Sequence, residues 1–294
     1  MSKALCRLTT DEARLFLEGV LWPEGPVCPR CKGKNARKME GKSCRPGLYN
    51  CRDCRKPFTV TVGTIFERSH YPLNDWVYAF SRMCASKKGI SALQLQRELD
   101  CQYRTAWFMC HRIRHAMAGN GFDPLVGEVE GDETYVGGKP RKGSGESKRG
   151  RGTKKVPVVA LVERGGRARA RVVTDVTAKT LRTVIGQNLC PTSTLITDEF
   201  SGYKTLGKDY ADHRTVCHSD GEYARPDGTN TNTVESYFAL IKRGVYGNFH
   251  HVSKKHLQRY CDEFSFRWDH RKIRDDERTV IAIEQSQGKR LTYA

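Results

Sequence analysis

Apolar side chains recur with helical spacing near the start of the chain. Residues 1–25 are typical of one short amphipathic helix that ends at Trp22. Its apolar side is formed by Ala13, Phe16, Leu17 and Val20. Residues 26–62 lack this periodicity and are rich in cysteine and turn residues, although apolar side chains alternate over residues 58–62. This alternation predicts a strand that closes a small, turn-rich unit.

Residues 71–118 show a helical pattern in three segments. A first helix is broken at Gly89, and Ser91 is the expected N-cap of a second, short helix. A turn near Asp100 leads to a third helix over residues 103–117. Two short helices around a tight turn are typical of a helix-turn-helix. The third helix carries basic side chains that would face DNA, namely Arg104, His111, Arg112, Arg114 and His115. A helical linker with a solvated basic face is the alternative interpretation.

From residue 125 the pattern changes to that of strands separated by turns and helices. Strands are predicted over residues 125–132, 156–163, 168–176, 194–199 and 214–219. Helices are predicted over residues 178–189, 203–206, 232–243 and 253–270. Three strands joined by hairpin connections, then alternating helices and strands, indicate a mixed sheet flanked by helices. This order resembles the RNase H-like fold of polynucleotidyl transferases.

The charge balance points to a polyanionic partner. The 294 residues include 51 Lys and Arg against 33 Asp and Glu, a net charge of +18, and such an excess repels itself unless nucleic acid neutralises it. Residues 139–155 hold eight basic residues and one acid among glycines, which predicts a mobile basic loop. No run of 18 apolar residues and no signal-peptide core is present, so we expect a cytoplasmic, nucleoid-associated protein without membrane contact.

Four of the twelve cysteines form two Cys-x2-Cys pairs. Cys28 and Cys31 are separated from Cys51 and Cys54 by 19 residues, the spacing of a four-thiolate Zn²⁺ site. Such a site has no open position for water, so the predicted zinc is structural. The intervening hairpin carries many Lys and Arg residues, which predicts contact with the phosphate backbone of DNA. Cys44 is interpreted as a bystander.

Three acids stand at the predicted ends of regular elements. Asp132 ends the first predicted strand of the sheet and Asp198 ends the fourth. Glu235 lies near the start of the helix that follows the fifth strand. Because the first and fourth strands can be central neighbours, the three carboxylates can converge on one or two Mg²⁺ ions, and two such ions about 3.5–4 Å apart suit phosphodiester chemistry. Acids at strand ends also serve as caps, so the pattern alone leaves a structural role open.

Several motifs occur in a familiar order. CPRC and CRDC are followed by VGTIFERS, YRTAWFMCHRIR, GDETYVGGK (131–139), ITDEFSGY (196–203) and ESYF with IKRGVYGNFHH (235–251). Together they resemble the DDE transposases of bacterial insertion sequences that carry an N-terminal zinc ribbon, over about residues 10–270. The resemblance implies an RNase H-like core that uses Mg²⁺ or Mn²⁺, binds double-stranded DNA at terminal inverted repeats, cleaves it, and transfers the 3′-hydroxyl to target DNA. It also implies a homo-oligomer on DNA.

The resemblance matches Asp132 and Asp198 to the first two catalytic acids, and either Glu235 or Asn232 to the third. Asn232 and Glu235 lie on one helical face, but their spacing is also that of a capping box. We favour Glu235, because a carboxylate neutralises a divalent ion and an amide does not. Asn232 is then the helix cap and a possible second ligand. The resemblance also assigns DNA contact to Lys242, beside Arg243, although a solvated helix end explains both.

The predicted fold is therefore α+β and multidomain. An N-terminal helix (1–25), a zinc ribbon (26–70) and a helix-turn-helix-like DNA-binding region (71–120) precede an RNase H-like catalytic domain (121–294). Two other functions stay open: a catalytically idle DNA-binding regulator derived from a transposase, and a repair or RNA-directed nuclease of the same fold. Asp175 is the main competing acid, and the motif match does not select it.

Overall fold

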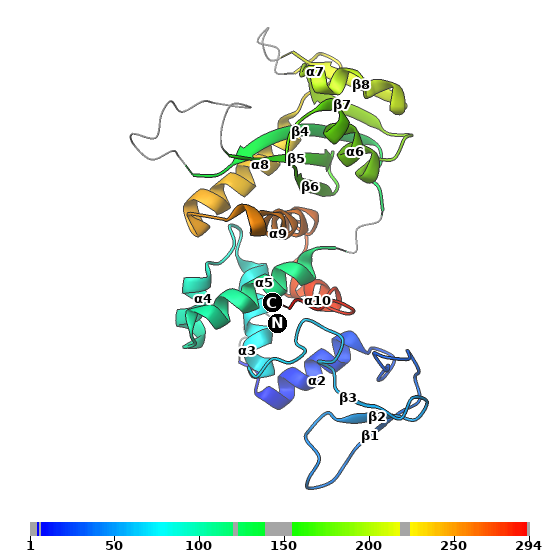
Figure 1. Cartoon of the computed structure of the whole chain (residues 1–294), viewed down its shortest axis with the longest axis vertical. Helices are drawn as coiled ribbons and strands as arrows, with labels where there is room; N and C mark the ends of the chain where they lie inside the picture. Colours follow the sequence, from blue (N-terminus) through cyan, green and yellow to red (C-terminus); the bar gives the residue numbers. More distant parts are fainter. Residues whose placement is uncertain (1–4, 6, 120–122, 139–154, 218–223, 293–294) are drawn as a thin grey trace. The chain divides into compact units, whose positions relative to one another are not determined.

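The computed structural model describes residues 5, 7–119, 123–138, 155–217 and 224–292 (Figure 1). The chain divides into two compact units. Unit 1 combines Met1–Gly119 with Lys272–Ala294, and unit 2 is Asn120–Arg271. The expected catalytic region of 121–294 is therefore too long at its C-terminal end. Residues 139–154, most of the predicted basic loop, lie outside the described residues.

Helix α2 of unit 1 spans Thr10–Leu21, in the region where the apolar spacing predicted a helix. Thr9 caps it through a capping box with Glu12, and Trp22 ends it. A three-stranded antiparallel sheet follows, composed of β1 (Ala36–Lys38), β2 (Tyr49–Cys51) and β3 (Pro57–Phe58). The strand predicted over residues 58–62 is wrong beyond Phe58, because backbone bonds such as Val62 N–H to Thr59 O turn the chain there.

Four further helices lie within the described residues of unit 1. They are α3 (Leu73–Ala85), α4 (Ala92–Leu99), α5 (Tyr103–Met117) and α10 (Asp275–Glu284). Ser91 caps α4 by accepting a hydrogen bond from the Gln94 amide, and Asp100 ends it with a φ of 47°. The tight turn between α4 and α5 thus lies where the sequence predicted it. Helix α10 was not predicted. It packs against α2, α3 and α5, which explains why the end of the chain belongs to unit 1.

Unit 2 is built on a five-stranded mixed sheet in the order β6-β5-β4-β7-β8. The strands are β4 (Glu128–Val136), β5 (Val156–Glu163), β6 (Ala168–Val172), β7 (Thr194–Asp198) and β8 (Asp212–Val216). The first three form an antiparallel meander, whereas β7 pairs parallel with both β4 and β8. The predicted first and fourth strands of this sheet, β4 and β7, are therefore central neighbours. This arrangement is the expected RNase H-like core.

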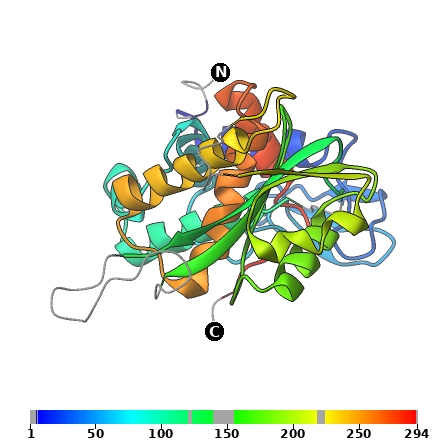
Figure 2. The same cartoon turned by 90° about the horizontal axis from the view of Figure 1, so that it is seen from above.

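Helices cover both faces of this sheet (Figures 1 and 2). Helix α6 (Ala178–Asn188) packs on one face with the short helix α7 (Ser201–Lys204). Helices α8 (Asn232–Gly244) and α9 (Leu257–Asp269) pack on the other. Short helical turns also occur at Gly207–Asp209, Val245–Phe249 and Lys254–His256. Side chains of β5 alternate between the two faces, as a strand covered on both sides requires.

The end of strand β4 differs from the sequence-based expectation, and the difference affects the surroundings of Asp132. The first strand of unit 2 was expected to end at Asp132, but β4 continues to Val136. The extension is stabilised by antiparallel pairing with β5, from Asp132 opposite Ala160 to Val136 opposite Val156. Asp132 therefore lies inside a strand. The backbone on either side of it is held by the ladder, so a loop-end capping role does not account for this acid.

Candidate metal centres and nucleic-acid interface

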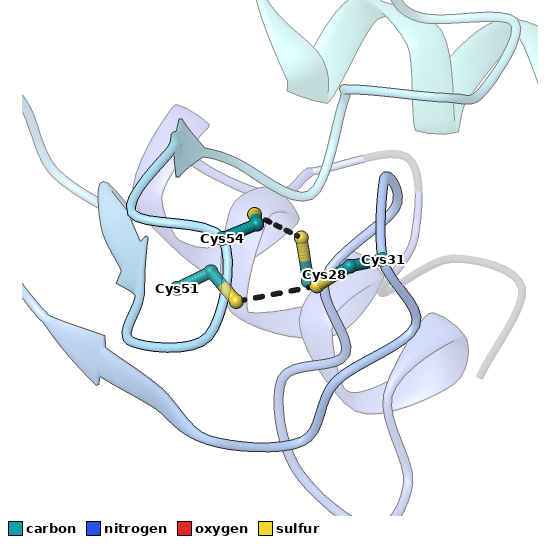
Figure 3. Close-up of side chains that lie close together, drawn as sticks. All are labelled: Cys28, Cys31, Cys51 and Cys54. Carbon is teal, nitrogen blue, oxygen red and sulfur yellow. Dashed lines mark hydrogen bonds between the residues drawn. The ribbon is translucent and has the colours of Figure 1, made fainter.

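The four predicted zinc ligands converge in unit 1 (Figure 3). The Sγ atoms of Cys28 and Cys54 are 3.7 Å apart, those of Cys31 and Cys51 are 3.5 Å apart, and all four lie within 4.8 Å of one another. Zinc–sulfur bonds of about 2.3 Å in a tetrahedron place sulfurs about 3.8 Å apart. The donor set and its spacing therefore fit one structural Zn²⁺, and Cys44 stays outside this group.

Both cysteine pairs use the same turn geometry. The residue after the second cysteine of each pair, Lys32 or Arg55, has a positive φ, of 61° and 57° respectively. Backbone bonds then close each turn, including Cys28 N–H to Gly33 O and Cys51 N–H to Lys56 O. The rings of Trp22, Tyr49 and Phe58 pack against one another, edge-on or stacked, in the same cluster as Cys28, Cys51 and Cys54. The ribbon has few other apolar side chains in this cluster, so a bound Zn²⁺ would supply much of its stability.

The acids of unit 2 are brought together by strand register. Glu130 of β4 lies opposite Ile196 of β7 in a parallel pair, and two residues further along both strands are Asp132 and Asp198. The two aspartates thus occupy matching positions and share one face of the sheet. Asp132 also lies opposite Ala160 of β5, whose side chain belongs to the core beneath α8 and α9. Both aspartates therefore face the side covered by α8, the helix that carries Glu235.

Helix α8 is tied to β4 at its first turn. The Glu130 carboxylate is fully buried and accepts hydrogen bonds from the amides of Thr233 (2.7 Å) and Val234 (2.9 Å). It also accepts one from the Thr233 hydroxyl at 2.8 Å. Two first-turn amides that the helix leaves unpaired are thereby satisfied by an acid from the sheet. Glu235 directly follows these residues.

The three carboxylates influence one another electrostatically. The pKa of Asp132 rises to about 8, chiefly because burial removes water from its carboxylate. The negative charges of Glu133, Asp198 and Glu235 raise this pKa further, whereas the Glu133 amide, which donates to Asp132 Oδ1 at 2.7 Å, lowers it. A divalent cation would relieve this repulsion. Hard oxygen donors crowded in this way fit Mg²⁺ or Mn²⁺.

The two candidate centres differ in how closely their donors are gathered. Within the part of the chain that the structure describes, only the cysteines form a compact group of three or more metal-ligating side chains. The three carboxylates are neighbours but are more widely spaced than the sulfurs. Asp132 and Asp198 also accept local hydrogen bonds from backbone amides, those of Glu133 and Phe200 respectively.

Comparison with known proteins identifies the chain. A family model described as ISXO2-like transposase domain matches residues 124–269, and one described as transposase zinc-ribbon domain matches residues 8–57. A protein of Halobacterium salinarum, described as an uncharacterized protein in transposable element ISH50, is 32% identical over 268 residues, which cover 86% of this chain and 88% of that protein. The chain belongs to the ISXO2-like transposase family. The resemblance drawn from the motifs is thereby confirmed.

The start of α8 in this transposase corrects one expectation. Asn232 is not the helix cap: Thr231 occupies that position, without a side-chain capping bond, and Asn232 is the first helical residue. The Asn232 amide donates to the Asn230 side chain at 3.1 Å, while Glu130 satisfies the next two amides. The side chains of Asn232 and Glu235 are both exposed. The capping box predicted from their spacing is replaced by an acid 103 residues away from Thr233 in sequence.

The basic residues of the transposase fall into two groups. Arg104 at the start of α5 is exposed, as are Lys242 and Arg243 in the last turn of α8. Arg112 is only 6% exposed, and its guanidinium donates to the carbonyls of Ile65 (2.7 Å) and Glu67 (3.1 Å). Its side chain therefore holds a loop inside unit 1. The expectation that Arg112 faces DNA is wrong, because the side chain is buried and one of its terminal nitrogens is bonded to these two carbonyls.

A basic groove of about 840 Å³ lies on the zinc ribbon. Its cations come from both β1 and the second cysteine turn, and its walls include the zinc ligand Cys51. The four basic residues that line it are Arg37, Lys38, Arg52 and Arg55, with Glu40 as the acid. Four cations around one concave surface suit the closely spaced phosphates of DNA. The ribbon was predicted to be basic, but the grouping of these four side chains was not.

The competing acid Asp175 has a local structural explanation. Its carboxylate accepts hydrogen bonds from the amide and hydroxyl of Thr177 and from the hydroxyl of Thr180, at the start of α6. These bonds hold the pKa of Asp175 well below its ordinary range. Asp175 therefore stabilises a helix start, and its charge is not among the main causes that raise the pKa of Asp132.

Sequence reasoning missed Glu130 and its partner Arg164. Arg164 donates from Nε to Glu130 at 3.0 Å and from a terminal nitrogen to Glu128 at 3.0 Å. Its other terminal nitrogen reaches the carbonyls of Gly228 and Asn230, in the loop before α8. A possible signal was the alternation of Glu128, Glu130 and Asp132 along one strand. The sequence contains nothing that connects these acids to a helix a hundred residues later.

Proposed function

We propose that this transposase binds the terminal inverted repeats of an insertion sequence and catalyses metal-dependent DNA strand cleavage and strand transfer. The proposal rests on the parallel pairing of β4 with β7. That pairing brings Asp132 and Asp198 to matching positions beneath α8, where Glu235 contributes to the local negative potential. The clustering of three acids from distant parts of the chain, in a protein of net charge +18, supports a role in binding a cation.

In this proposal the carboxylates of Asp132, Asp198 and Glu235 hold one or two divalent ions. When bound, Mg²⁺ or Mn²⁺ supplies the positive charge that activates the attacking oxygen and stabilises the leaving one. Cleavage adds water across a phosphodiester bond and leaves a 3′-hydroxyl and a 5′-phosphate. In joining, that 3′-hydroxyl attacks a target phosphodiester and displaces a target 3′-hydroxyl. Asn232, exposed one turn before Glu235, is kept as an additional ligand.

The DNA-binding part of the proposal uses both units. The ribbon groove and Arg104 contact DNA through unit 1, and Lys242 and Arg243 contact phosphates through unit 2, about two helical turns beyond Glu235. The partners are double-stranded terminal repeats and target DNA, on which the protein acts as a homo-oligomer at the nucleoid of the cytoplasm. No helix in the described ranges is long and apolar enough to span a bilayer.

The test is a strand-cleavage and joining assay on DNA that carries the ends of the element. Purified protein is incubated with Mg²⁺, with Mn²⁺, or with a chelator, and products are resolved as single strands. The proposal expects cleavage only with metal, at the junction between element and flanking DNA. Specific binding to the ends without cleavage under any metal condition would instead identify a catalytically idle regulator. The DNA for the assay is taken from the sequences that flank the gene, in which the proposal expects short inverted repeats.

A further inference from the structure

Glu130 occupies an unusual place for an acid. Its side chain has no exposed surface, and it lies on β4, the middle strand of the five-stranded sheet. A buried carboxylate is costly unless its charge is neutralised and its oxygens accept hydrogen bonds. Here both conditions are met by α8 and by Arg164, through the three bonds to Thr233 and Val234 and the 3.0 Å ion pair.

The same contacts determine where α8 begins. The amides of Thr233 and Val234 belong to the first turn, where the helix dipole favours a negative charge. Arg164 adds a second connection, because it joins Glu130 to the carbonyls of Gly228 and Asn230 in the preceding loop. The first turn of α8 and the approach to it are therefore both attached to one residue of β4.

This attachment lies next to the proposed metal ligands. Glu130 and Asp132 are two residues apart on the same face of β4, a separation of about 7 Å along the strand. Glu235 follows Val234 directly, so about 1.5 Å of helix rise separates it from the bonded amides. The distance between Asp132 and Glu235 thus depends on a short, hydrogen-bonded path through Glu130.

We propose that Glu130 is a positioning residue: with Arg164, it holds the first turn of α8 so that Glu235 is presented to the cation that Asp132 and Asp198 share. This inference rests on the proposed function, since it assigns a role within that site. Glu130 does not contact DNA or metal in this proposal. Outer residues that orient metal ligands typically contribute about 10- to 100-fold to metal affinity or activity.

The experiment compares Glu130→Gln with a matched control, Glu163→Gln. Glu163 of β5 is also buried, accepts backbone amides from Val126 and Arg167 at 2.9 Å each, and pairs with the Arg167 side chain, but none of these partners belongs to α8. Each variant removes the charge of one buried glutamate from the same sheet. We also include Thr233→Val, which removes only the hydroxyl donor and keeps the backbone bonds.

Three measurements are made on the full-length protein: amide hydrogen exchange at Thr233 and Val234, the Mg²⁺ concentration for half-maximal cleavage, and the melting temperature. Glu130→Gln is expected to speed exchange at both amides and to raise the Mg²⁺ requirement about tenfold or more, with a smaller effect in Thr233→Val. Glu163→Gln is expected to lower the melting temperature while leaving the exchange and the Mg²⁺ requirement unchanged.

The outcomes separate this proposal from the proposed function. Wild-type Mg²⁺ dependence in Glu130→Gln, despite faster exchange at Thr233 and Val234, would overturn the positioning role. An equal rise in the Mg²⁺ requirement in Glu163→Gln would also overturn it, because a general loss of stability would then explain both variants. If the wild-type protein shows no metal-dependent cleavage, the proposed function fails. The exchange data then still show whether Glu130 holds α8, and unchanged protection in Glu130→Gln contradicts that part directly.

Discussion

Asp132 and Asp198 lie at matching positions on two parallel, adjacent strands, each two residues beyond the last paired positions Glu130 and Ile196. The charge of Asp198 is one of the causes that raise the pKa of Asp132 to about 8, after burial and the charge of Glu133. Two acids from separate segments of the chain are therefore electrostatic neighbours. We expect substitution of either one to affect the same reaction.

Asp132→Asn and Asp198→Asn are each expected to reduce cleavage and joining by at least about 100-fold, because each removes a charge that stabilises the transition state through the metal. DNA binding is expected to change little, since the ribbon and α5 are untouched. Asp175→Asn is the control, an acid of unit 2 whose carboxylate is used at the start of α6. Cleavage rates and binding isotherms measured side by side test the prediction. Near-wild-type cleavage by either variant would count against the proposed metal site of Asp132, Asp198 and Glu235.

The third ligand is tested by Glu235→Gln and Asn232→Ala in a cleavage assay across a Mg²⁺ and Mn²⁺ titration. We expect Glu235→Gln to be inactive, because an amide does not neutralise the cation. Asn232→Ala is expected to keep its free energy of unfolding within about 0.5 kcal/mol of wild type, since Thr231, not Asn232, is the cap of α8. An active Glu235→Gln beside a folded, inactive Asn232→Ala would transfer the ligand role to Asn232.

Zinc content gives an independent prediction for unit 1. The wild-type chain is expected to hold one Zn²⁺, and the double variant Cys28→Ser, Cys51→Ser is expected to lose it together with the fold of the ribbon. Cys44→Ser, outside the sulfur group, is expected to retain the metal. Elemental analysis of purified proteins decides the matter. Full zinc retention in the double variant would refute the four-thiolate site.

The basic groove on the ribbon is expected to make DNA affinity depend on salt concentration. Replacing Arg37, Lys38, Arg52 or Arg55 by Ala is expected to lower the slope of log affinity against log salt by about 1 for each phosphate that the variant no longer binds. Preference between DNA sequences is expected to change little, since phosphate contacts position the protein without reading bases. Lys34→Ala is the control, because Lys34 is paired with Glu24 at 2.7 Å. Binding titrations at several salt concentrations provide the slopes. A collapse of sequence preference at constant slope would show that the groove reads bases.

Asp175, at the start of α6, is expected to make the stability of the folded protein depend on pH. The pKa of Asp175 is depressed in the folded protein by hydrogen bonds from Thr180 and Thr177, so its stabilising contribution exists above its ordinary pKa and is lost as pH falls through the acid range. Asp175→Asn is expected to lower the melting temperature at neutral pH, and the difference from wild type is expected to shrink as the solution is acidified below the ordinary pKa of Asp, about 3.9. A difference that stays constant with pH would show that the charge is irrelevant.

The sequence by itself determined the local features of this transposase. Four cysteines at fixed spacing predicted the sulfur group, and Ser91 and Asp100 marked the turn between α4 and α5. A run of apolar residues predicted β5 at its observed bounds, Val156–Glu163. These features depend on neighbours in sequence or on the chemistry of single side chains. They can therefore be read from residue spacing and from helical or strand periodicity.

Only the tertiary structure decided which distant residues meet. Arg112 looked like a DNA contact on its helix, but it reaches the carbonyl of Ile65, 47 residues earlier. Asn232 had the spacing of a cap, but Glu130 of β4 satisfies the amides of α8. A buried polar group must find a partner wherever the fold supplies one, and nothing in the local sequence records whether that partner is close along the chain or far from it. Strand register and helix packing, which the whole chain determines, made those choices.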